Sequence, residues 1–160
     1  MMGAGKTSVG RVLAERLGLP FADSDVEIER ETGLTIPCIF DRSGEAHFRE
    51  LERRVMARLV AGPPGVIAGG GGAFADAETR ALILERCIAV WVDADVETLA
   101  ARVGGGPRPL LRGRDPHEVL AGLAERRRDA YAAAPLKVSS ARSPAETAQA
   151  VLEALLERAR

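Results

Sequence analysis

The sequence predicts an α/β fold in which a parallel β-sheet is flanked by helices on both faces. Three observations predict it: short apolar segments alternate with helical segments, polar residues follow the ends of the apolar segments, and a glycine-rich phosphate-binding motif opens the chain. Parallel strands need crossover connections, so this alternation favours a sheet that helices cover. Ligands of such sheets bind beyond the carboxyl ends of the strands, where we expect the polar residues to converge.

The individual elements follow from apolar spacing and from stop signals. The expected strands are short apolar runs, at 19–22, 65–68, 88–92 and 136–139. The expected helices are 7–17, 26–32, 36–41, 45–60, 77–86, 96–103, 117–133 and a terminal helix from Pro144. Gly18 is expected to end the first helix, and Asp76 to begin the helix at 77–86 as its cap. Ser143 and Glu146 form a capping box for the last helix.

The first residues contain most of a phosphate-binding loop. Gly5-Lys6-Thr7 ends the pattern G-x-x-x-x-G-K-[ST], whose first glycine would fall one residue before Met1. Such a loop curls its backbone N–H groups around a phosphate, and the following helix directs its positive end at the same anion. Lys6 adds a charge, and the Thr7 hydroxyl suits Mg²⁺, which prefers oxygen ligands. The expected ATP-binding residues are Gly3, Ala4, Gly5, Lys6, Thr7 and Ser8.

The strand that normally leads into such a loop would also lie before Met1. We therefore expect that the sequence starts too late, that Met1 or Met2 is an internal residue of the loop, and that the first, central strand is missing. A protein starting at Met1 would then be marginally stable and bind ATP poorly, because the loop would lack rigid support. A truncated, non-catalytic remnant stays open as an alternative.

Length and composition set further limits. A chain of 160 residues suits one domain, residues 1–160. The net charge of −1 and 4% aromatic content argue against a nucleic-acid partner. No apolar run is long enough for a bilayer, so we expect no membrane partner. Cys38 and Cys87 have no metal-binding spacing and are interpreted as reduced thiols of a cytoplasmic protein.

Two carboxylates, Asp23 and Asp25, follow the strand expected at 19–22. Phosphoryl transfer needs a phosphate cradle, Mg²⁺ ligands, a positioned acceptor hydroxyl and cations for the transferring charge. One carboxylate can approach Mg²⁺ together with Thr7, and the other can face the acceptor. The alternative role is a helix cap for the next segment, and Asp25 fits that role well.

Five motifs in order and register resemble the shikimate kinase family. The resemblance covers nearly the whole chain, which makes it much more specific than any one motif. The motifs are Gly3-Ala4-Gly5-Lys6-Thr7-Ser8-Val9-Gly10 with Phe21-Ala22-Asp23-Ser24-Asp25, then Gly44-Glu45-Ala46-His47-Phe48-Arg49-Glu50-Leu51-Glu52, Gly70-Gly71-Gly72-Ala73, Arg108-Pro109-Leu110-Leu111, and Arg127 four residues before Tyr131.

The resemblance implies an enzyme that phosphorylates the 3-hydroxyl of shikimate with ATP and Mg²⁺, a step toward chorismate and the aromatic amino acids. It also implies a monomer whose partners are ATP and shikimate. A lid is expected around 104–116 and a substrate-binding helical segment around 26–60. Another small-metabolite kinase, similar to gluconate kinase, is the alternative, although three arginines and a glycine turn argue against it.

The resemblance also implies roles for individual residues. Asp25 would orient or deprotonate the attacking hydroxyl, and Asp23 would hold Mg²⁺ with Thr7. Arg49 and Arg127 would bind the shikimate carboxylate, which suits the planar guanidinium. Further expected substrate contacts come from Gly70, Gly71 and Gly72, with Phe40 and Phe48 as apolar walls and Glu52 holding Arg49. Lys6 and the lid residue Arg108 would contact the phosphates, and Arg102 and Arg142 could flank adenine.

Overall fold

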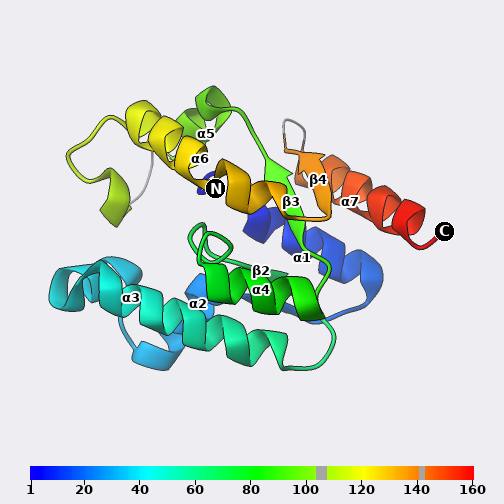
Figure 1. Cartoon of the computed structure of the whole chain (residues 1–160), viewed down its shortest axis with the longest axis horizontal. Helices are drawn as coiled ribbons and strands as arrows, with labels where there is room; N and C mark the ends of the chain where they lie inside the picture. The colour runs from blue at the N-terminus through cyan, green and yellow to red at the C-terminus, as the bar shows by residue number, and fades with distance from the viewer. Residues whose placement is uncertain (104–107, 141–142) are drawn as a thin grey trace.

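The computed structural model describes residues 1–103, 108–140 and 143–160, and it shows helices alternating with short strands (Figure 1). The first half of the chain contains α1 (Lys6–Leu17), β1 (Phe21–Asp23), α2 (Ser24–Thr32), α3 (Ile36–Val60), β2 (Val66–Ala68) and α4 (Ala77–Arg86). The second half contains β3 (Val90–Asp93), α5 (Val96–Val103), the 3₁₀ turn η1 (Pro109–Leu111), α6 (Pro116–Ala132), β4 (Leu136–Ser139) and α7 (Pro144–Arg158). The predicted alternation is confirmed.

The helix boundaries follow from local chemistry. Gly18 ends α1 in the left-handed region at φ 63°, which glycine adopts without steric cost. The Asp76 side chain accepts the N–H of Thr79 at the start of α4, as expected of a cap. Ser143 and Glu146 form the predicted capping box of α7. The helices expected at 36–41 and 45–60 form one helical run, α3, in which Gly44 is non-helical at φ 79° and ψ 173°.

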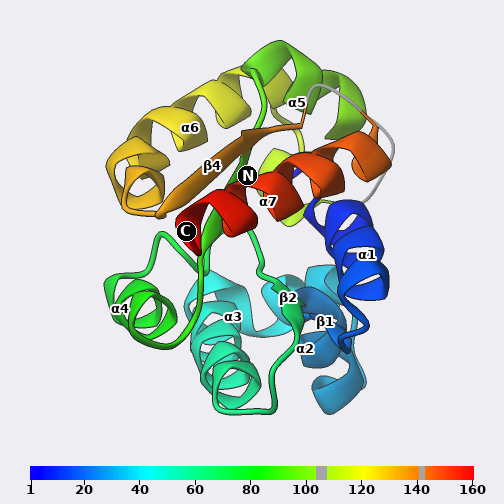
Figure 2. The same ribbon diagram turned by 90° about the vertical axis from the view of Figure 1, so that its right-hand side faces the viewer.

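The strands form two parallel pairs. β1 pairs with β2, placing Asp23 opposite Ala68, and β3 pairs with β4, placing Asp93 opposite Ser139. Within the described residues, β2 and β3 are not paired with each other, and a groove of about 560 Å³ with mostly apolar walls lies between them. The parallel direction is as predicted, and the described strands form two separate pairs, β1–β2 and β3–β4, instead of one continuous sheet (Figure 2).

Two apolar clusters hold these elements together. The larger cluster joins α1, α5, α6 and α7 to the second strand pair through residues such as Leu13, Leu99, Leu120, Val138 and Val151. The smaller cluster lies within the α2–α3 segment and contains Ile28, Ile39, Phe48, Leu51 and Val55. The segment expected to bind the substrate therefore has a small core of its own, which positions the polar residues of α3. No helix in the described part of the chain is long and apolar enough to cross a bilayer.

Candidate active site

The phosphate-binding loop precedes α1 and depends on two glycines. Gly3 and Gly5 have φ values of 78° and 80°, in the left-handed region that residues with a Cβ rarely adopt. A Cβ at Gly3 would also lie 2.9 Å from Cγ1 of Val103, so this position has no room for a side chain. Lys6 folds back over the loop, and its Nζ donates to the Met1 carbonyl at 2.6 Å. Burial lowers the pKa of Lys6, and the charge of Asp25 opposes that shift.

Asp23 connects the loop to the start of α2. Its Oδ2 accepts the hydroxyl of Thr7 at 2.6 Å, which brings together the two residues expected to hold Mg²⁺. Its Oδ1 accepts the backbone N–H groups of Asp25 and Val26 at 3.0 and 3.3 Å. Asp23 is therefore the N-cap of α2, and the alternative in which Asp25 caps this helix is wrong. The side chain of Asp25 is left available for another role.

Asp25 lies in the first turn of α2, with its carboxylate directed into the interior. Its Oδ1 is buried and has no hydrogen-bond partner within the described residues. Burial raises the pKa of Asp25 to about 6, and the charges of Asp23 and Glu52 add to the shift, whereas Lys6 opposes it. A buried carboxylate with a pKa near neutrality can accept a proton from a substrate hydroxyl at physiological pH.

A cavity of about 460 Å³ opens beside Asp25. Its polar walls carry three arginines and three carboxylates, and its apolar walls come mainly from α3. The polar residues are Asp25, Glu29, Arg49, Glu52, Arg108 and Arg127, and the apolar ones include Ile36, Phe40, Phe48 and Leu110. The expected apolar walls Phe40 and Phe48 thus lie at this cavity, with ring centroids 4.9 Å apart.

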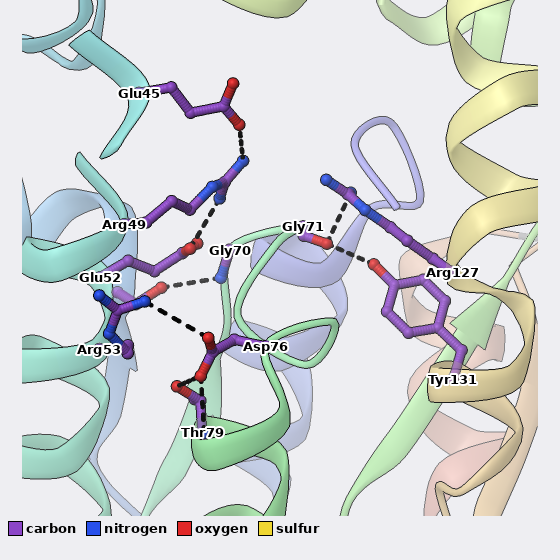
Figure 3. Close-up of polar contacts among 11 residues, drawn as sticks. Glu45, Arg49, Glu52, Arg53, Gly70, Gly71, Asp76, Thr79, Arg127 and Tyr131 are labelled. Carbon is purple, nitrogen blue, oxygen red and sulfur yellow. Dashed lines mark hydrogen bonds and ion pairs between the residues drawn. The ribbon is translucent and has the colours of Figure 1, made fainter. Parts of the chain in front are cut away.

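Arg49 projects from α3 and is held by two carboxylates of the same helix. Its Nη1 donates to Glu52 at 2.7 Å and its Nη2 donates to Glu45 at 3.0 Å (Figure 3). Glu52 is only 2% exposed, and its second oxygen, Oε1, is buried without a partner in the described part of the chain. The guanidinium is therefore positioned at the cavity wall by a buried partner, as expected for Glu52.

The glycine turn after β2 passes very close to these side chains. A Cβ at Gly70 would lie 2.6 Å from Oε1 of Glu52 and 2.8 Å from Oδ1 of Asp25. A Cβ at Gly72 would lie 2.0 Å from Nη1 of Arg49. The Gly70 N–H donates to the fully buried Ser24 hydroxyl at 2.8 Å, which ties the turn to α2. A side chain at Gly70 or Gly72 would therefore displace one of these carboxylates or the guanidinium from its place at the cavity.

Arg127 reaches the same turn from the opposite side. It is 8% exposed on α6, and its Nη1 donates to the Gly71 carbonyl at 2.7 Å (Figure 3). Arg49 and Arg127 thus approach the cavity from different helices. Two residues at the turn were not predicted as site residues: Ser24, and Tyr131, whose hydroxyl donates to the Gly71 carbonyl at 2.5 Å. The i, i+4 spacing of Arg127 and Tyr131 was the available signal.

The described part of the expected lid lies against the cavity. Arg108 lines it, and its Nε is buried with no hydrogen-bond partner in the described ranges. Arg112 forms an ion pair with Asp41 of α3 at 2.7 Å, which joins this segment to α3. Residues 104–107 of the expected lid lie outside the described residues, and so does Arg142, which was expected near adenine.

A smaller hollow, of about 230 Å³, lies next to the phosphate-binding loop. Ala4, Gly5 and Ser8 line it together with Arg102 and Ser140. Arg102 donates to the Ser140 carbonyl at 2.8 Å and to the Gly3 carbonyl at 3.4 Å, so it joins this loop to the segment after β4. The hollow thus lies next to the residues expected to bind the phosphates.

The residues near the loop fit a magnesium ion that arrives with the nucleotide. Within the described residues, no group of three or more His, Cys, Asp or Glu side chains could hold a metal by itself. Mg²⁺ in kinases usually takes only one or two protein ligands and completes its shell with phosphates and water. The adjacent Thr7 hydroxyl and Asp23 carboxylate match that donor set.

The fold and the site define a phosphate-binding-loop kinase with an arginine-rich pocket for a small acceptor. The family model described as shikimate kinase matches residues 2–156. Shikimate kinase from Caulobacter vibrioides strain NA1000 is 54% identical over 157 residues, covering 97% of this chain and 78% of its own length. Shikimate kinase from Zymomonas mobilis is 53% identical, covering 91% of this chain and 84% of its own length. The chain belongs to the shikimate kinase family.

Solved structures of shikimate kinases have the same fold as this chain. Shikimate kinase from Acinetobacter baumannii in complex with shikimate superposes with a TM-score of 0.95 at 40% identity, covering 98% of this chain and 89% of that chain. Shikimate kinase from Aquifex aeolicus superposes with a TM-score of 0.88 at 36% identity, covering 99% of this chain and 94% of that chain. A gluconokinase from Sinorhizobium meliloti reaches 0.60 at 21% identity, covering 97% and 87%, which shows likeness of fold alone.

Proposed function

We propose that the protein transfers the γ-phosphoryl group of ATP to the 3-hydroxyl of shikimate, giving ADP and shikimate 3-phosphate for the synthesis of chorismate and the aromatic amino acids. The observation that carries the proposal is the cavity in which Asp25 lies with Arg49 and Arg127. Two guanidinium groups suit a carboxylate, and a carboxylate of raised pKa suits a hydroxyl. The similarity to a shikimate kinase solved with shikimate supports this choice of substrate.

In the proposed complex, two arginine side chains bind the negative charge of the substrate together. Arg49 and Arg127 bind the shikimate carboxylate, and the glycine turn offers the backbone N–H groups of Gly71 and Gly72 to the ring hydroxyls, since the Gly70 N–H already donates to Ser24. The partly buried guanidinium of Arg49 is already held by Glu45 and Glu52, so little side-chain entropy is lost when the substrate binds. The expected result is a pocket that selects an acid with a hydroxyl several ångströms from its carboxylate.

In the transfer step one bond forms, one bond breaks and one proton moves, and Asp25 is the proton acceptor. The shikimate oxygen forms a bond to the γ-phosphorus, the bond from that phosphorus to the β,γ-bridging oxygen breaks, and the hydroxyl proton passes to Asp25. Lys6 and Arg108 stabilise negative charge on the transferring group, and the loop from Gly3 to Ser8 holds the other phosphates. Thr7 and Asp23 would hold Mg²⁺, which neutralises phosphate charge when bound. The hollow beside Arg102 is the proposed place for the base of the nucleotide, with Arg142 as its expected neighbour.

The remaining features of the proposal concern the whole molecule. We place the protein in the cytoplasm as a monomer that acts on ATP and shikimate, with no nucleic-acid or membrane partner. Residues 1–160 form one kinase domain, in which 26–60 bind the substrate and 104–116 form a lid over the nucleotide. The two free cysteines and the slight net charge of −1 support this setting.

ADP release tests the proposed function. The protein is mixed with ATP, Mg²⁺ and either shikimate, gluconate or no acceptor, and ADP is followed with a coupled enzyme assay. Release that requires shikimate supports the proposal. Release that prefers gluconate would favour the other kinase class, and no release above the acceptor-free rate would favour a non-catalytic remnant.

A further inference from the structure

The Gly71 carbonyl accepts two hydrogen bonds from the same helix. Arg127 donates from Nη1 at 2.7 Å and Tyr131 donates from its hydroxyl at 2.5 Å, and the two residues are one turn apart on α6 (Figure 3). Arg127 lines the substrate cavity, whereas Tyr131 is not among the described residues that line it. The two donors therefore share an acceptor, but only one of them can reach the substrate.

In this arrangement Arg127 would have to donate to the Gly71 carbonyl and also bind the substrate carboxylate. A guanidinium binds a carboxylate best through two parallel N–H groups, and one of its terminal nitrogens is occupied by Gly71. If Arg127 turns toward a carboxylate, the bond to Gly71 is lost or weakened. A carbonyl left without a partner away from water is costly, so another donor is needed there.

The surroundings of Tyr131 suit its hydroxyl to be that donor. It is 7% exposed, and its ring contacts the rings of Phe74 and Trp91, with centroids 6.3 and 5.8 Å away. Burial raises the pKa of Tyr131, so the hydroxyl stays protonated and can donate. The Gly70 N–H is held independently by Ser24 at 2.8 Å, so hydroxyl groups hold the turn at two adjacent residues.

We propose that Tyr131 is a positioning residue: its hydroxyl holds the Gly71 carbonyl in place while Arg127 turns to the carboxylate of the substrate. This inference rests on the proposed function, because it needs an anionic substrate at Arg127. Without the hydroxyl, Arg127 is the remaining donor to Gly71, and substrate binding must break that bond. The cost falls on shikimate binding, and ATP binding and the chemical step are spared.

Tyr131→Phe tests the inference because it removes the hydroxyl and keeps the ring. Loss of one hydrogen bond predicts that the KM for shikimate and its Kd by calorimetry rise roughly three- to tenfold. The kcat and the KM for ATP should stay within about twofold. Trp91→Phe is the matched control, since it disturbs the packing of the Tyr131 ring and leaves the hydroxyl. It should lower thermal stability and leave the KM for shikimate unchanged.

In a second test, Tyr131→Phe is introduced into the Arg127→Lys variant, and its effect there is compared with its effect in the wild type. Lysine has no planar fork to share between Gly71 and the substrate, so Tyr131→Phe should change shikimate affinity by less than about twofold in that background. An unchanged KM in the single variant, the same increase in both backgrounds, or a similar increase in Trp91→Phe would overturn the inference. A wild-type protein that binds shikimate without releasing ADP would refute the proposed function alone, because the calorimetric comparison still tests Tyr131.

Discussion

Arg49→Lys is the sharpest test of the proposed carboxylate-binding pair, Arg49 and Arg127. Arg49 donates to Glu52 at 2.7 Å and to Glu45 at 3.0 Å, and the planar group still faces the cavity. Lysine keeps the charge but cannot bond to the buried Glu52 and present two parallel donors to a carboxylate at the same time. Loss of one charge-assisted hydrogen bond costs about 1.5–3 kcal/mol, which predicts a roughly 10- to 150-fold rise in the KM for shikimate.

The assay for Arg49→Lys is steady-state ADP release at varied shikimate and saturating ATP, followed by the reverse titration. The KM for ATP should stay within about twofold, because Arg49 lies on the substrate side of the glycine turn. Arg53→Lys is the matched control: it lies one turn further along α3, is 41% exposed, and contacts Asp76 at 3.4 Å. It should change neither KM. An unaltered KM for shikimate in Arg49→Lys would refute the carboxylate-binding role.

Three further predictions concern the same cavity. Asp25→Asn should lower kcat by roughly 10²–10⁴ and leave the melting temperature nearly unchanged; a large loss of stability with kcat preserved would show a structural role only. In the wild type, kcat/KM for shikimate should fall as the pH drops below about 6, because Asp25 then becomes protonated and cannot accept a proton; a flat profile between pH 5 and 7 would contradict this. Gly72→Ala should raise the KM for shikimate, since its Cβ would meet Arg49 at 2.0 Å, whereas Gly69→Ala, whose nearest neighbour would lie 3.9 Å away, should not; equal effects would refute the close-approach argument.

The sequence allowed most elements to be predicted because their boundaries depend on local chemistry. Asp76, Gly18 and the Ser143–Glu146 pair cap their helices through bonds within a few residues of the chain. Which strands pair with each other could not be predicted in the same way. Strand pairing joins residues far apart in the sequence, such as Asp23 with Ala68, and no local pattern specifies it.

The candidate site, like the fold, could be predicted from the sequence only in part. The motifs predicted that Asp25, Arg49 and Arg127 would converge, and all three line one cavity. The sequence did not show that Asp23 caps α2, since either aspartate could have done so. It also did not show that Ser24 and Tyr131 hold the glycine turn, because those bonds span 46 and 60 residues. The i, i+4 spacing of Arg127 and Tyr131 places both donors on one face of α6, but nothing in the sequence specifies the distant acceptor.

The most direct test of the proposed function is the identity of the phosphorylated product. The protein is incubated with shikimate, ATP and Mg²⁺, and the acceptor product is examined by phosphorus–proton correlation NMR. We expect one new product, with phosphorus coupled to the proton on carbon 3 of shikimate, formed in a one-to-one ratio with ADP. Phosphorus on a different hydroxyl, or ADP formed without a phosphorylated acceptor, would contradict it.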